Sequence, residues 1–217
     1  MNRFFLRTAA IFAALAAVIL SSLGRASDAT NHVPTDYTGK PETGAPRTIP
    51  GTILAIDYDE APAGAKEVSF SYHGKRVQTK FRKDADSIGI AGFGKGHVST
   101  NGMPEDPNQA YVGWTQGGEW LKYTVNVTES GTYVIGAKVA AGAKGATLSF
   151  SFASELSTGD IEIPSTAGFQ PGVEVYHVWE KLDALKEITL PAGTYVMTVK
   201  IGQIAGLNLH SFTFTKK

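Results

Sequence analysis

Hydrophobic and polar residues alternate in several short runs of the chain. In residues 121–127, leucine, tyrosine and valine occupy every second position. The same period of two recurs in three further runs, whose hydrophobic positions are Tyr133, Ile135, Ala137 and Val139; Leu148, Phe150 and Phe152; and Tyr195, Met197, Val199 and Ile201. Such alternation gives a strand one buried and one solvated face, so it predicts antiparallel strands that pack face to face.

Turn-forming residues separate these runs at positions 128–131, 142–145 and 191–193. After the N-terminal region, no stretch of eleven or more residues repeats its hydrophobic positions with the helical period of 3.6. We therefore predict an all-β fold, a single antiparallel β-sandwich of the jelly-roll type, over residues 49–217.

The N-terminal region differs from this pattern. Residues 1–7 contain two arginines and no acidic residue, and residues 8–23 are hydrophobic apart from one threonine and two serines. This arrangement, closed by Ala26, is typical of a signal peptide, and the hydrophobic run is short for an uncleaved membrane anchor. We expect removal of residues 1–26 and a secreted or periplasmic protein. Residues 27–48 are rich in proline, threonine and glycine without any period, which predicts a flexible linker.

Composition and hydrophobic pattern argue against nucleic acid and membrane as partners. Lysine plus arginine and aspartate plus glutamate both number 20, so the formal net charge is zero and nothing indicates the basic surface that nucleic acid requires. No second long hydrophobic run follows the N-terminal one, so we expect no membrane contact after signal removal. The chain has no cysteine, so its stability must come from the core rather than from disulfides.

Four segments resemble a known family. Residues 111–125 read Y-V-G-W-T-Q-G-G-E-W-L-K-Y-T-V, with G-T-Y at 131–133; residues 163–169 read I-P-S-T-A-G-F; residues 190–194 read L-P-A-G-T; and residues 207–212 read L-N-L-H-S-F. Together they are similar to the signature of family 6 carbohydrate-binding modules, which belong to the galactose-binding-like β-sandwiches. The resemblance extends over residues 49–214, nearly all of the chain after the linker.

The resemblance implies a ligand-binding cleft built from loops. Trp114 corresponds to the aromatic residue that forms one wall, and Asn208 to the asparagine that binds sugar hydroxyls on the floor. Phe169 lies at the matching loop position for the opposite wall, but Tyr176 fits the aromatic spacing that follows, so both are candidates. The physical logic is general: aromatic ring faces cover the C–H faces of a pyranose, while fixed amides select hydroxyl orientations. Trp120, Tyr123 and Trp179 are instead expected to pack within the fold.

One departure from the family concerns calcium. Many members carry I-E-A-E near the start, and these glutamates bind a structural calcium ion together with an aspartate of the closing motif. Here the matching positions are Leu54, Ile56 and His210. Because Ca²⁺ requires oxygen ligands, we predict that this metal site is absent and that the chain has no cofactor. The acidic residues just beyond, at positions 57, 59 and 60, are expected to form a solvated turn.

Catalysis is not indicated. The acidic residues Asp86, Glu119, Glu155 and Asp160 form no recognisable pair of the kind that glycosidases require, and no serine or cysteine nucleophile motif is present. We predict non-catalytic binding to a polysaccharide such as a β-glucan, xylan or agarose, with a separately encoded glycoside hydrolase as a further candidate partner. The alternative is an exported structural or adhesion protein that uses the same sandwich to contact another protein.

Overall fold

The computed structural model describes residues 30–74, 82, 88–93, 97–99, 110–167 and 175–217. The predicted signal peptide, residues 1–26, lies outside this part of the chain. No helix within the described residues is long and hydrophobic enough to span a membrane.

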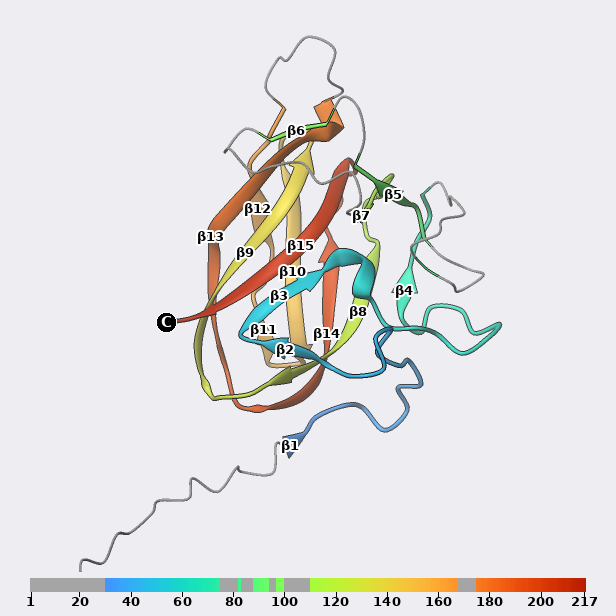
Figure 1. Ribbon diagram of the computed structural model, residues 1–217, viewed down its shortest axis with the longest axis vertical. Coiled ribbons are helices and arrows are strands. Elements are labelled where there is room, and N and C mark those ends of the chain that lie inside the picture. Colours follow the sequence, from blue (N-terminus) through green and yellow to red (C-terminus); the bar gives the residue numbers. More distant parts are fainter. Residues whose placement is uncertain (1–29, 75–81, 83–87, 94–96, 100–109, 168–174) are drawn as a thin grey trace, which may run out of the picture.

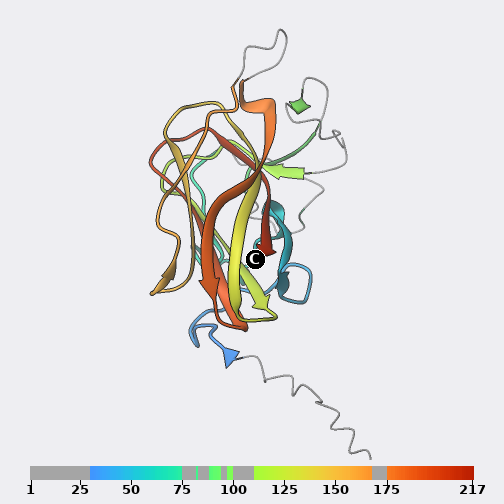
Figure 2. The same cartoon turned by 90° about the vertical axis from the view of Figure 1, so that its left-hand side faces the viewer.

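Two β-sheets pack face to face around one hydrophobic core (Figure 1, Figure 2). The first sheet contains β1 (Thr30–Asn31), β2 (Arg47–Ile49), β4 (Phe70–Ser71), β8 (Trp120–Val127), β10 (Ala146–Ala153), β11 (Leu156–Ser157), β12 (Ile161–Ile163) and β14 (Gly193–Ile201). The second contains β3 (Gly51–Leu54), β5 (Ile90–Gly92), β6 (Val98–Ser99), β7 (Ala110–Val112), β9 (Gly131–Ala141), β13 (Val178–Leu190) and β15 (Leu207–Lys216). Two short 3-10 helices, η1 (Ala55–Asp57) and η2 (Val175–His177), complete the described elements.

The long strands pair in an antiparallel manner. In the first sheet the order is β11-β10-β14-β8-β2, and in the second it is β5-β7-β15-β9-β13-β6. Among the strands of the described residues, parallel pairing is confined to three short contacts, β1 with β14, β2 with β8, and β6 with β13. The predicted all-β sandwich is therefore confirmed.

The core follows the alternation in the sequence. In β8, β10 and β14, the residues at every second position are buried and point toward the opposite sheet. Aromatic rings meet edge to face across the interface: Phe212 of β15 lies 5.2 Å from Phe150 and 6.1 Å from Tyr123, measured between ring centroids. Such edge-to-face pairs add to the stabilisation from buried hydrophobic area.

The structure differs from the predicted flexible linker. Within residues 30–48, here called the N-terminal arm, β1 and β2 add to the first sheet. The His32 ring stacks on Tyr195 at 4.5 Å between centroids, and the Tyr37 hydroxyl donates a hydrogen bond of 2.8 Å to Asp59. The composition of the arm is that of a linker, but its backbone and side chains find partners on strands distant in sequence. The folded unit therefore begins well before residue 49.

The acidic segment that begins with the last residue of η1 is also not a solvated turn. Asp59 is buried and accepts hydrogen bonds from the backbone and hydroxyl of Thr124, at 2.8 and 2.5 Å, as well as from Tyr37. Burial raises the pKa of Asp59, although the hydrogen bonds from Thr124 oppose this. Asp57 is also buried and pairs with Arg47 at 2.8 Å, so the two acids connect the N-terminal arm to the sandwich. Only the third acid of the segment, Glu60, is exposed.

Candidate functional site

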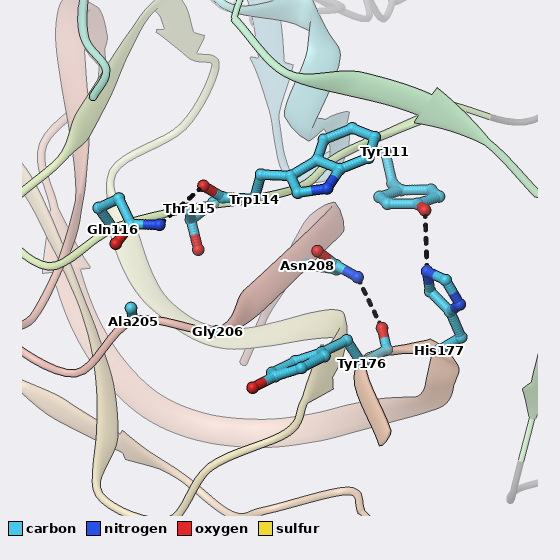
Figure 3. Close-up of a pocket in the computed structure, with 9 residues that line it drawn as sticks. All are labelled: Tyr111, Trp114, Thr115, Gln116, Tyr176, His177, Ala205, Gly206 and Asn208. Carbon is cyan, nitrogen blue, oxygen red and sulfur yellow. Dashed lines mark hydrogen bonds between the residues drawn. The ribbon is translucent and has the colours of Figure 1, made fainter. Parts of the chain in front are cut away.

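Loops at one end of the sandwich enclose a cleft of about 320 Å³. These loops are the β7–β8 connection and the β14–β15 connection, together with η2. The N-terminal strand β1 pairs with the start of β14 and so lies away from this end of the sandwich. The cleft is lined by Tyr111, Trp114, Thr115, Gln116, Tyr176, His177, Ala205, Gly206 and Asn208 (Figure 3). Most of these residues come from loops or strand ends, where side chains can be displayed without disturbing the sheets.

Trp114 forms one side of the cleft. Its side chain is 41% exposed, and its φ of 53° lies in the left-handed region, which a bulky residue seldom adopts. The next residue secures this turn, because the Thr115 hydroxyl donates to the Leu207 carbonyl at 2.6 Å and accepts from the Leu207 N–H at 3.2 Å. A bulky ring held exposed in an uncommon backbone conformation is typical of a functional position.

A buried carboxyl group supports the same turn. Glu119 is 1% exposed and accepts hydrogen bonds from the N–H of Gln116 at 2.8 Å, of Gly74 at 2.9 Å, and of His73. The Tyr72 hydroxyl adds a bond of 2.7 Å to the Gly113 carbonyl. The segment after β4 is thereby joined to both ends of the loop that carries Trp114.

Tyr176 forms the opposite side of the cleft. It lies at the centre of η2 and is 45% exposed. Figure 3 shows the Trp114 and Tyr176 rings on opposite sides with the Asn208 side chain between them. The Asn208 Nδ2 donates to the Tyr176 carbonyl at 2.6 Å, so the floor of the cleft fixes the position of η2.

The floor residue keeps polar groups for a ligand. Asn208 is 7% exposed, and its amide carries two N–H donors and one acceptor oxygen. The bond to the Tyr176 carbonyl uses one donor. One amide hydrogen and the Oδ1 acceptor have no other hydrogen bond within the described residues, which suits them to the hydroxyls of a polar ligand.

A polar pair lies at one end of the cleft. The Tyr111 hydroxyl and His177 Nε2 are 3.2 Å apart (Figure 3). Behind them the His177 ring stacks on His97 at 4.1 Å between centroids, and the Trp179 indole N–H donates to His97 Nδ1 at 3.2 Å. This packed group supports η2 from the side away from Asn208.

Comparison with known proteins identifies the family. The model of carbohydrate binding module family 6 matches residues 92–216, more than half of the chain. The chain belongs to this family. As a family 6 carbohydrate-binding module, it binds carbohydrate and is non-catalytic. The comparison with curated proteins finds no match.

Solved structures agree on the fold of the module. A β-1,3-glucan-binding family 6 module from Bacillus halodurans shares 18% identity, covers 78% of this chain and 98% of its own, and gives a TM-score of 0.51. A glycoside hydrolase family 43 arabinoxylan arabinofuranohydrolase from Bacillus subtilis, solved with cellotetraose, shares 14% identity over 80% of this chain and 28% of its own, also with a TM-score of 0.51.

The structure brings together three of the four residues predicted for the module's site. Trp114, Tyr176 and Asn208 line the same cleft, whereas Phe169 lies outside the described residues. Sequence reasoning did not select Tyr111, Thr115, Gln116 or His177. Two of these four, Thr115 and His177, directly adjoin a predicted site residue, so the signal for them was proximity to Trp114 or Tyr176 rather than residue type.

Two of the three aromatic residues predicted to pack within the module are buried. Tyr123 is 0% exposed in the core, and Trp179 is 1% exposed in a smaller cluster with Phe93 and Tyr111. Trp120 differs, because it is only partly buried and the Lys122 ammonium lies 4.8 Å from its ring centroid. It belongs to the outer face of the first sheet rather than to the core.

The positions predicted to have lost the family's calcium ligands have other contacts. Ile56 packs against the core, and the buried His210 ring stacks on Phe93 at 5.4 Å between centroids. The Arg82 guanidinium donates to the carbonyls of Ile56 and Tyr58, so these oxygens already bind a cation. Within the described part of the module, no group of three or more histidine, aspartate or glutamate side chains is placed to hold a metal.

Chelation is therefore expected to leave the stability of the module unchanged. Adding EDTA should not shift the melting temperature, since no bound ion would be removed from the native state. Differential scanning calorimetry with EDTA, and then with excess Ca²⁺, measures this. A fall of several degrees that Ca²⁺ restores would contradict the prediction.

Proposed function

We propose that the chain binds the sugar rings of an external polysaccharide between Trp114 and Tyr176, with Asn208 as the polar anchor. The observation that supports this is the arrangement of two exposed aromatic rings on opposite sides of one cleft with a side-chain amide between them. Phe169 remains a further candidate for the wall on the Tyr176 side.

The chemistry of the cleft matches that of a pyranose ring. Each face of the ring presents C–H groups, which pack favourably on the electron-rich faces of aromatic side chains. The equator presents hydroxyl groups, which the Asn208 amide and the Tyr111–His177 pair can bind by donating and accepting hydrogen bonds. Carbohydrate recognition thus needs no charged group, and the residues that line the cleft include no aspartate, glutamate, lysine or arginine.

The ligand class that we propose is a β-glucan, a xylan or an agarose-like polysaccharide. The Bacillus halodurans module is described as binding β-1,3-glucan, and the Bacillus subtilis enzyme was solved with cellotetraose, so these glycans are the first to test. We further propose that the binding module acts beside a glycoside hydrolase encoded separately.

Affinity electrophoresis and calorimetry against a glycan panel test the proposal. The panel contains laminarin, mixed-linkage β-glucan, xylan and agaro-oligosaccharides, with the α-glucan pullulan as the control. We expect retardation by at least one β-linked glycan and heats of binding with its oligosaccharides. Binding to none of them would favour the alternative in which the sandwich contacts another protein.

Export is the remaining part of the proposal. The basic residues and short hydrophobic run before Ala26 support removal of residues 1–26 and a secreted or periplasmic location. N-terminal sequencing of the protein from the culture medium or periplasm should begin near Ser27. Recovery of the chain in membranes with Met1 intact would show an anchor instead.

A further inference from the structure

The Tyr176 ring lies against two glycines. A β-carbon built on Gly142 would come 2.3 Å from both Cδ1 and Cε1 of the ring, and one built on Gly206 would come 2.8 Å from Cε1. Both distances are shorter than real β-carbon contacts. A side chain at position 142 or 206 would therefore occupy space that the Tyr176 ring fills. The wall of the cleft that Tyr176 forms thus depends on glycine at both positions.

Gly142 has no backbone reason to be glycine. Its φ lies outside the left-handed region, whereas Gly206 has a φ of +95° that other residues rarely adopt. The backbone around Gly142 is also fixed: its N–H donates to the Gly206 carbonyl at 3.2 Å, and the preceding N–H of Ala141 donates to the Thr166 hydroxyl at 2.9 Å. That hydroxyl in turn donates to the Val178 carbonyl at 2.6 Å, directly after η2.

We infer that Gly142 is a positioning residue for the ligand, because its missing side chain holds the Tyr176 ring at the distance from Trp114 that a sugar ring requires. The inference rests on the proposed function of the cleft. A β-carbon at position 142 would clash with the Tyr176 ring, and the fixed backbone cannot move to relieve this clash. The ring must therefore move away from its present position. The cleft then loses the aligned second wall although every residue that contacts the sugar is still present.

Gly142→Ala in the full chain tests this. We expect its affinity for the glycan that the wild type binds to fall about tenfold, since ring alignment determines the stacking contact. In a Tyr176→Ala background the same substitution should have no further effect, because no ring remains to be displaced. The ring proton chemical shifts of Tyr176 should move in Gly142→Ala even without glycan.

Gly131→Ala is the matched control at the other end of β9. Its β-carbon would meet only the flexible Lys216 side chain at 3.0 Å, so affinity and the Tyr176 shifts should stay those of the wild type. If Gly142→Ala is poorly folded, Gly142→Ala with Tyr176→Ala should regain stability, since the collision is removed. Unmoved Tyr176 shifts, or equal losses of affinity with and without the ring, would overturn the inference. Wild-type binding to no glycan would instead contradict the proposed function.

Discussion

Replacement of Trp114 by alanine is expected to lower the affinity for the bound glycan about five- to more than hundredfold, or about 1–3 kcal/mol. The ring is one of the two aromatic walls and is substantially exposed, so its loss removes stacking without leaving a hole in the core. Isothermal titration calorimetry against the glycan selected from the panel measures the change. Asn208→Ala should give a loss of similar size, because the floor amide holds η2 and, in the proposed complex, also binds a sugar hydroxyl.

Two further variants separate the ring from the turn that carries it. Glycine adopts the φ of 53° at position 114 more readily than alanine, so Trp114→Gly should lose binding equally while the loop stays in place. Trp120→Ala removes an identical side chain six residues away, outside the cleft, and should bind as the wild type does. Wild-type affinity in folded Trp114→Ala would show that the cleft is assigned wrongly.

Alternation predicted the strands where one sheet face meets the core and the other meets solvent. It holds in β8 and β10. It fails in the second half of β9, where every residue from Gly136 to Ala141 is buried. There the outer face is also covered, and Ala140 packs with Phe93 and Trp179, which are distant in sequence. The period of two at Ala137 and Val139 identifies the face that meets the core, but the burial of the other face arises from these distant contacts and is not encoded in the alternation.

The N-terminal arm is a second region where local sequence did not predict the structure, because an ordered segment was predicted to be flexible. Residues 30–48 contain few hydrophobic side chains, so composition predicts a linker. Their order depends on individual partners such as Tyr195 for His32 and Asp59 for Tyr37, which are 163 and 22 positions away. No local pattern encodes such contacts, because each arises only when the sandwich has formed.

The candidate site was predicted through motifs rather than through physics alone. Trp114 and Asn208 lie within segments that resemble the family signature, and both line the cleft. Tyr176 could be predicted only from the spacing of aromatic residues in the family signature. The contact between its ring and Gly142 could not be predicted from the sequence at all. Gly142 belongs to a stretch whose composition indicates a turn, and its role depends on where η2 lies in three dimensions.

Glu119 is the position where a single substitution should affect stability and binding together. It is buried, and three backbone N–H groups from two separate loops donate to its carboxyl oxygens. Glu119→Ala leaves these donors without their acceptor, so we expect the free energy of unfolding to fall by about 2–4 kcal/mol in urea titrations. Glu119→Gln retains one acceptor oxygen and should lose less. Glu155→Ala, at an exposed acidic residue, is the matched control and should be neutral.

Amide hydrogen exchange measures whether the loss of the Glu119 carboxyl group loosens the loops at the cleft. The N–H groups of His73, Gly74 and Gln116 should lose protection in Glu119→Ala, while amides in the centre of β8 keep theirs. Glycan affinity should fall as well, because Gln116 then no longer fixes the turn that displays Trp114. Unchanged protection at these three amides would mean that Glu119 does not join the two loops. Lost protection with wild-type affinity would mean that the Trp114 turn is held by Thr115 and Leu207 alone.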